Sequence, residues 1–257
     1  MKRFCFTVDD NIRFLREITE GSLRSLFEHP YLAMYKSLHE RYGLKVQLNL
    51  FFEEGDFNLS SVMHIYRDEW RDASDWLKLS FHSRSETVRP YEHSGYCEVY
   101  NDCRSVNREI YRFADPASLA KTTTVHYCLA TDEGISALYD NGVFGLLGLY
   151  GSADAPAVSY CRTEKECASL RNGETVYANR VLFGAIDIVL NRYSIPEILE
   201  KLEALGTREQ INIMIHEQYF YPDYPAYQDN FCEKLDAAIG WLDQQGYGSI
   251  FFEELLG

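Results

Sequence analysis

Two adjacent carboxylates, Asp9 and Asp10, follow the first apolar run of the chain, residues 4–8. An apolar run that ends in acids is typical of a buried strand that carries carboxylates to its C-terminal end. Because successive side chains of a strand point to opposite faces, the two aspartates are expected to have different roles. One could hold a metal ion while the other handles a proton.

Histidines accompany three other predicted strands. His82 follows the strand at residues 76–81, His216 follows the strand at residues 211–215, and His126 lies inside a strand predicted at residues 121–129. Carboxylate and imidazole together suit zinc and similar divalent ions, so these residues are candidate metal ligands.

Each of these assignments has a plainer alternative. Asp10 stands where a helix starting at Asn11 could be capped, and His126 between apolar neighbours could be a hydrogen-bonded core histidine. Glu53 and Glu54, just past another strand, are read as solvated rim residues.

The elements that must position these residues alternate between strand and helix. Hydrophobic periodicity predicts strands at residues 4–10, 44–52, 76–81, 121–129, 143–150, 181–190, 211–215 and 248–252, and helices at 11–27, 30–42, 96–113, 130–141, 195–205 and 231–242. Residues 151–180 are predicted to be an insertion or a hairpin. This order predicts an α/β fold, a distorted (β/α) barrel of seven or eight mostly parallel strands in a single domain spanning residues 1–257, with its working groups at the strand C-termini.

The composition narrows the classes of molecule that the protein is expected to bind and the compartment in which it is expected to occur. The net charge of −14, from 25 basic and 39 acidic residues, disfavours binding to nucleic acid. No run approaches the 18 to 20 or so apolar residues of a membrane span, and the apolar run near the start is too short for a signal peptide. The seven cysteines include no C-x-x-C pair, and Cys103 falls on the buried stripe of a helix, so we expect reduced thiols in a cytoplasmic protein. The sequence leaves the oligomeric state open.

The motifs resemble those of the polysaccharide deacetylase (NodB-homology) family, part of a larger β/α-barrel group of glycoside hydrolases and deacetylases. Residues 7–10, Thr-Val-Asp-Asp, are similar to the T-F-D-D motif that opens the family domain, and residues 80–83, Ser-Phe-His-Ser, resemble the start of its H-[ST]-x-x-H motif. The strand that ends in His216 resembles the late motif of an apolar strand followed by histidine. The order and spacing of the motifs agree over nearly the whole chain.

The resemblance implies a role for each matched residue. Asp9 would be the general base, His216 the general acid, and Asp10 and His82 metal ligands. The second histidine of the ligand motif is Glu86 in this chain, so either Glu86 or His126 would supply the third ligand.

Two further departures concern the residues that support the site. The family's R-x-P-Y-G motif has no equivalent after the fourth strand, so the arginine that holds the base would be missing or would come from Arg84 or Arg89. Asp187 is a weak candidate for the aspartate that orients the acid histidine.

The function implied by the resemblance is a metal-dependent deacetylase, with zinc as the first candidate ion. Its substrate would be an acetylated sugar, such as a nucleotide- or lipid-linked amino sugar or a soluble oligosaccharide. Tyrosines at residues 219–224 could stack on the sugar rings. The alternatives are a metal-independent glycoside hydrolase that uses Asp9 with another acid across the bond, and a noncatalytic descendant that binds a glycan or a protein partner.

Overall fold

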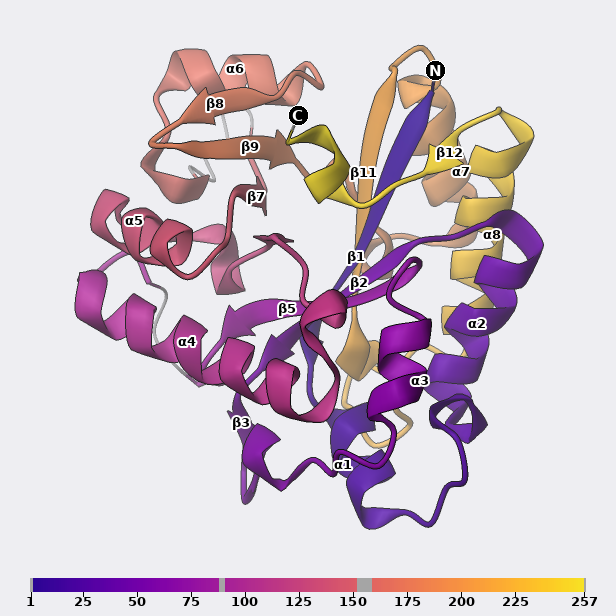
Figure 1. Ribbon diagram of the computed structural model, residues 1–257. Helices are drawn as coiled ribbons and strands as arrows, with labels where there is room; N and C mark the ends of the chain where they lie inside the picture. The colour runs from indigo at the N-terminus through magenta and orange to yellow at the C-terminus, as the bar shows by residue number, and fades with distance from the viewer. Residues whose placement is uncertain (1, 88–90, 152–158, 257) are drawn as a thin grey trace.

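The computed structural model describes residues 2–87, 91–151 and 159–256, which form an α/β fold (Figure 1). The strands are β1 (Arg3–Asn11), β2 (Val46–Phe51), β3 (Glu53–Glu54), β4 (Phe57–Asn58), β5 (Leu77–Ser83), β6 (Thr122–Thr123), β7 (Gly145–Gly148), β8 (Val176–Ala178), β9 (Val181–Ala185), β10 (Ile188–Val189), β11 (Gln210–His216) and β12 (Gly248–Ser249). The helices are α1 (Arg13–Glu20), α2 (Pro30–Tyr42), α3 (Arg67–Asp72), α4 (Tyr96–Phe113), α5 (Asp132–Asp140), α6 (Glu164–Arg171), α7 (Ile195–Leu205) and α8 (Phe231–Gln244).

Two mainly parallel sheets hold all the described strands except β3 and β4, which pair with each other antiparallel. The larger has the order β10, β11, β1, β2, β5, and β12 pairs with the start of β1. The smaller has the order β6, β7, β9, β8, with only β8 antiparallel to its neighbour among these strands. Both faces of β1 and β2 are buried, as expected for parallel strands joined by helical crossovers.

The two sheets meet at two places. On one side, a parallel bridge between Leu79 and Leu119 joins β5 to the segment just before β6. On the other, only Ile186 and Asp187 separate β9 from β10, and the N–H of Ile186 bonds to β7 while that of Asp187 bonds to β11. The strands therefore follow one another round a distorted barrel, as predicted.

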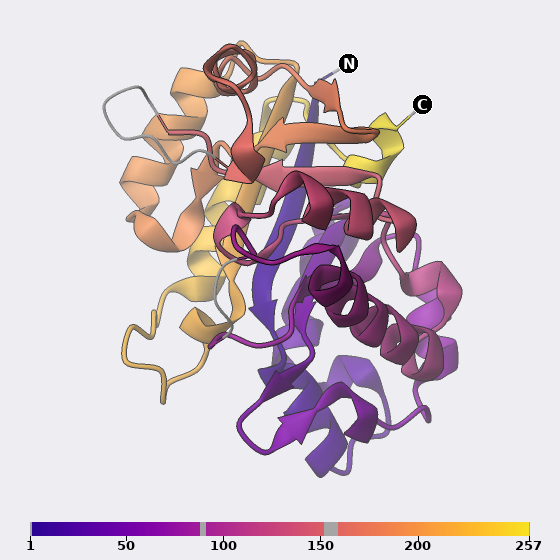
Figure 2. The same cartoon turned by 90° about the vertical axis from the view of Figure 1, so that its left-hand side faces the viewer.

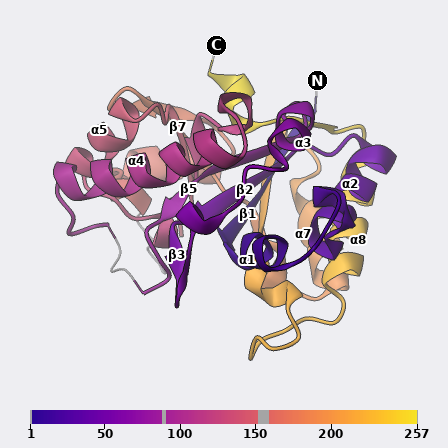
Figure 3. The same ribbon diagram turned by 60° about the horizontal axis from the view of Figure 1, so that its bottom comes forward.

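Helices flank the strands on two sides. Helices α4 and α5 lie together on one side, with α4 against β5, and α2, α7 and α8 lie on the other (Figures 1 and 3). The start of β1 and the C-terminal segment share one end of the molecule, and α1 and the β3–β4 hairpin occupy the opposite end (Figure 2). None of the helices in the described part of the chain is long and apolar enough to cross a membrane.

Several predicted elements are confirmed. Helix α2 starts at Pro30 and ends before Gly43, whose φ of 64° is the left-handed conformation that glycine adopts most easily. Helix α4 has the predicted bounds, with Cys103 buried on its inner face. The predicted strands that lead into His82 and His216 correspond to β5 and β11.

The first predicted helix and the last predicted strand are wrong in extent. The first helix was expected to run from Asn11 to residue 27, but α1 covers only Arg13–Glu20 and the chain turns extended at Gly21. Asn11 belongs to β1 and bonds through its side chain to the Val8 and Asn49 carbonyls, so it caps no helix. The last strand, expected at residues 248–252, stops at Ser249.

The predicted strand at residues 121–129 is also wrong beyond β6. Tyr127 and Cys128 have φ values of 61° and 56°, which break the extended run and turn the chain at His126–Cys128. His126 therefore lies in a turn at the end of the barrel rather than inside a strand. The strand predicted at residues 181–190 is divided into β9 and β10.

The region at residues 151–180 is partly described. It contains α6 and then β8, which forms an antiparallel hairpin with β9. Residues 152–158 of this predicted insertion lie outside the described residues.

Candidate metal centre and its surroundings

A bulge at the end of β1 sets the positions of both aspartates. The pairing of β1 with β2 shifts register between Val8 and Asn11, and Asp10 has a φ of 62°. A bulge with a left-handed residue breaks the alternation of side chains, so Asp9 and Asp10 both line one cavity of about 540 Å³ instead of pointing to opposite faces. The strain of a left-handed aspartate is typical of a functional position.

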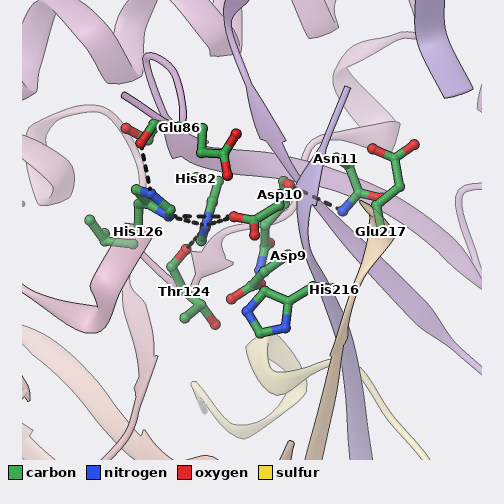
Figure 4. Close-up of polar contacts among 12 residues, drawn as sticks. Asp9, Asp10, Asn11, His82, Glu86, Thr124, His126, His216 and Glu217 are labelled. Carbon is green, nitrogen blue, oxygen red and sulfur yellow. Dashed lines mark hydrogen bonds and ion pairs between the residues drawn. The ribbon is translucent and has the colours of Figure 1, made fainter. Parts of the chain in front are cut away.

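Asp10, His82 and His126 converge on one point, and all three are buried (Figure 4). The Asp10 Oδ1 atom lies 3.0 Å from His82 Nε2 and 3.4 Å from His126 Nδ1. The two imidazole nitrogens lie 3.1 Å apart. These three side chains come from β1, β5 and the turn after β6.

The remaining ring nitrogens determine which atoms are free to bind a cation. His82 Nδ1 lies 2.6 Å from the Thr124 carbonyl oxygen, and His126 Nε2 lies 3.3 Å from the Glu86 carbonyl oxygen. A carbonyl can only accept, so each of these nitrogens carries the hydrogen and the facing nitrogens of the two neutral rings present lone pairs. Two lone pairs and a carboxylate oxygen that converge in this way require a shared proton or a metal ion, and a metal-binding histidine usually donates its other N–H to a carbonyl in this manner. The three residues therefore fit a divalent metal.

The charges in this group stabilise one another. Burial opposes ionisation of Asp10, but its contacts with His126 and His82 outweigh burial and hold its pKa well below the ordinary value. For His82, burial is outweighed by Asp9 and Asp10, so its pKa is raised. The second Asp10 oxygen accepts a hydrogen bond of 2.7 Å from Gln218, which fixes the carboxylate plane.

Asp9 lies beside this group and has a different partner. Its Oδ1 accepts a hydrogen bond of 2.7 Å from the side-chain amide of Asn49, on β2. Burial raises the pKa of Asp9, against the lowering effect of His82 and His216. Among the described residues, the hydrogen-bond partner of Asp9 is thus a neutral amide, and no arginine bonds to it.

His216 is also supported by an amide. Its Nδ1 lies 2.9 Å from the side-chain oxygen of the buried Asn191, so Nδ1 carries the hydrogen and Nε2 remains available to the cavity. Burial lowers the pKa of His216, against Asp10 and Asp9, which raise it. His216 is therefore mainly neutral at pH 7.

We expect Asn191→Asp to raise the pKa of His216 by about one to two units, because a carboxylate at hydrogen-bond distance stabilises the imidazolium. The measurement is an NMR titration of the histidine ring protons, with the His216 signals assigned by their loss in His216→Gln. The signals of His93, which is exposed and distant from His216 in the sequence, serve as the internal control. An unchanged His216 pKa would show that the two side chains are not in contact in solution.

Several candidate residues do not take the predicted roles. Glu86 lines the cavity, but its carboxylate is outside the converging group, and its backbone carbonyl orients His126. Arg84 pairs with Glu53 at 3.0 Å on the exposed β3 hairpin, so it does not hold Asp9, and Arg89 lies outside the described residues. Asp187 bonds to Arg208 and to a backbone N–H of β11, so it does not orient His216.

The aromatic loop after His216 has a mixed role. Tyr219 lines the cavity, whereas Phe220 packs against Tyr31 and the Tyr221 hydroxyl bonds to the buried Glu217. Asn49, Asn191 and Gln218 support the site and were not predicted from the sequence. Their signal was the presence of amides on, or just after, strands that are otherwise apolar.

Glu217 holds the chain segment that directly follows Asp10. Its carboxylate accepts hydrogen bonds from the backbone N–H groups of Ile12, Arg13 and Phe14 at 2.6, 3.0 and 2.7 Å. It thereby caps α1 directly after the bulge that carries Asp10. Burial raises the pKa of Glu217 to about 7, although these donors favour the charged form.

Comparison with known proteins shows the fold. No protein-family model matches the chain, and no curated protein matches its sequence. Among solved structures, 4-alpha-glucanotransferase from Thermococcus litoralis aligns with 99% of this chain and 40% of its own at 13% identity and a TM-score of 0.64. A peptidoglycan N-acetylglucosamine deacetylase aligns with 98% of this chain and 87% of its own at 10% identity and a TM-score of 0.51.

A mutant of a CE4 family pseudoenzyme with restored enzymatic activity aligns over 100% of this chain and 68% of its own, at 15% identity and a TM-score of 0.48. Identities this low establish architecture and leave activity to the site itself. The architecture agrees with the resemblance in the sequence motifs, because the chain has a fold similar to that of the glucanotransferase and of the peptidoglycan N-acetylglucosamine deacetylase.

Proposed function

We propose that the chain is a metal-dependent hydrolase that removes an acetyl or similar acyl group from an amino sugar or another carbohydrate. The observation that carries this proposal is the convergence of one ligand atom each from Asp10, His82 and His126 beside a separate carboxylate and a separate imidazole. A divalent ion held by these three residues, zinc first, would polarise an acyl carbonyl and lower the pKa of a water molecule there toward about 7.

The two remaining residues would handle protons. Asp9, whose pKa is raised by burial, would take a proton from the attacking water. His216 would donate a proton from Nε2 to the departing nitrogen or oxygen. Because the pKa of His216 is lowered, the protonated form is depleted as the pH rises toward 6.5, and we expect turnover to be greatest on the acidic side of neutral.

We expect the purified protein to bind close to one divalent ion per chain, and His82→Ala, His126→Ala and Asp10→Ala to lose it. Glu86→Gln is the matched control and should keep the metal, since the Glu86 carboxylate is outside the converging group. The measurement is elemental analysis of untagged protein before and after reconstitution with zinc, cobalt or nickel. Metal loss in Glu86→Gln but not in His126→Ala would reverse the assignment of the third ligand.

Acetate release then tests the reaction. The probes are N-acetylglucosamine oligosaccharides and O-acetylated xylo-oligosaccharides, assayed with metal-loaded protein and with protein treated with a chelator. Acetate release that requires metal supports the proposal. Cleavage of glycosidic bonds in chelator would instead support a metal-independent glycoside hydrolase, and glycan binding with neither metal nor acetate release would support a noncatalytic binding protein.

A further inference from the structure

One arginine lies among the residues that line the cavity. Among the described residues that line the cavity, Arg192 is the only arginine or lysine. It follows Asn191 in the 3₁₀ turn Leu190–Arg192, directly after β10, and it is exposed. Its position next to the residue that holds His216 brings a cation to the lining of the same cavity.

Arg192 has no partner within the described part of the protein. Many of the arginines in the described residues are in ion pairs, such as Arg13 with Asp223, Arg84 with Glu53 and Arg162 with Asp132, and among the unpaired ones only Arg192 lines this cavity. The chain has 39 acidic residues against 25 basic ones, so carboxylates are abundant. A guanidinium left unpaired at a cavity mouth in such a protein is available to an anionic ligand, and its fork of donors matches phosphate and carboxylate oxygens.

The backbone that carries Arg192 is held in place. The Asn191 carbonyl accepts a hydrogen bond of 2.7 Å from Gln228, whose own side-chain oxygen accepts one of 2.7 Å from Lys234. The Asn191 side chain is fixed by His216. A binding group that starts from a fixed backbone loses less entropy when it engages a ligand.

The aromatic ring of Tyr127 also lines the cavity. Tyr127 is 58% exposed, and both Tyr127 and Cys128 have left-handed φ values that cost conformational energy. This turn holds the Tyr127 ring against the ring of His126, with the centroids 4.1 Å apart. Tyr219 lies near His216, with a centroid distance of 6.1 Å. An exposed ring at a cavity mouth offers a flat apolar surface to the face of a sugar.

We propose that the site binds a sugar that carries an anionic group, a phosphate or a carboxylate, with Arg192 binding the anion and Tyr127 contacting the sugar ring. The inference that this sugar carries an acyl group rests on the proposed function, whereas the inference that it carries an anion and a sugar ring does not. The substrate class would then be acidic acylated sugars rather than neutral glycans.

The test is isothermal titration calorimetry with three probes on metal-loaded protein. N-acetylglucosamine 1-phosphate presents a phosphate, N-acetylmuramic acid presents a carboxylate, and N-acetylglucosamine is neutral. We expect at least one anionic probe to bind about tenfold or more tightly than the neutral probe, and Arg192→Gln to reduce that preference to about twofold or less. Arg108→Gln removes an exposed arginine from α4 and should leave the preference unchanged. The better of the two anionic probes distinguishes phosphate from carboxylate, and equal binding of all three probes to the unmodified protein would overturn the proposal.

An anion could bind to the metal ion instead of to Arg192. The variant His82→Ala, which should lose the metal, distinguishes these two possibilities. A preference that persists in His82→Ala and is lost in Arg192→Gln supports the proposal. A preference that is lost in His82→Ala and kept in Arg192→Gln overturns it. Acetate release from neutral sugars without any preference for anions would overturn this proposal and leave the proposed function standing. An Arg192-dependent preference without bound metal or acetate release would support this proposal and contradict the proposed function.

Discussion

Replacing Asp9 with asparagine should lower turnover by about 10² to 10⁴-fold while the bound metal stays nearly stoichiometric. Asp9 lies in the cavity beside the converging ligands but is held by Asn49 instead of joining them. Asparagine keeps the shape and can still accept that hydrogen bond, but it cannot take a proton from water. Metal content and the rate of acetate release, measured on the same preparation, check both halves of this expectation.

The matched variant is Asp10→Asn, one residue along the same bulge. It should lose most of the metal, because its oxygen is one of the three converging ligand atoms. Equal metal loss in both variants would mean that Asp9 is also a ligand and would remove it from the role of base. Unchanged turnover in Asp9→Asn with metal retained would point to another base in the cavity.

The barrel and the ends of three of its strands could be predicted because they depend on local patterns. The apolar runs that become β1, β5 and β11 are long enough to identify as strands. Each has, at or near its C-terminal end, an aspartate or a histidine that could bind a metal or transfer a proton. Parallel strands bring their C-termini to one end, so Asp9, Asp10, His82 and His216 could be expected to meet without knowledge of any contact.

The details of the site could not be predicted because they depend on register and on turns. The alternation rule for strands placed Asp9 and Asp10 on opposite faces, and only the bulge seen in the pairing with β2 turns both into the cavity. His126 sits in a β-branched and aromatic run that favours a strand, and the left-handed Tyr127 that ends the run has no marker such as glycine.

The supporting amides illustrate a further limit. Gln47 and Asn49 alternate on β2 with Val46, Leu48 and Leu50, and all five are buried. A buried amide must be hydrogen-bonded, so their presence could have indicated a polar network inside the barrel. Which residue each amide would bind is decided by strand register, which local sequence does not specify. The same applies to Asn191, which takes the place that Asp187 was expected to fill.

The largest structural effect should come from Glu217, whose role is visible only in three dimensions. Its carboxylate receives three backbone N–H groups at the start of α1 and the Tyr221 hydroxyl at 3.1 Å, and its side chain is fully buried. No side chain of β1 or α1 caps this helix, so Glu217 joins the end of β11 to the segment directly after Asp10. The sequence shows only an acid next to a histidine.

We expect Glu217→Ala to lower the free energy of unfolding by about 3 kcal/mol or more, because buried donors left without an acceptor cost about 1 to 3 kcal/mol each. Tyr221→Phe removes one donor to the same carboxylate and should cost about 1 kcal/mol. Glu197→Ala, which removes an exposed carboxylate from the capping box of α7, is the control for loss of a helix cap and should also cost about 1 kcal/mol or less. The measurement is urea unfolding followed by circular dichroism, with the slope compared among variants.

The same variant should weaken metal binding in the protein that remains folded. Asp10 is held in a left-handed conformation two residues before Ile12, and that conformation persists only while the surrounding structure enforces it. Without the Glu217 carboxylate, the segment after Asp10 loses the acceptor for three consecutive N–H groups, and the carboxylate of Asp10 is no longer fixed opposite His82. Zinc affinity measured by competition with a chelator should therefore fall in Glu217→Ala and stay unchanged in Glu197→Ala. Unchanged affinity with a loss of stability would restrict Glu217 to capping α1, and a loss of stability no larger than that of Tyr221→Phe would show that water replaces the carboxylate at this helix end.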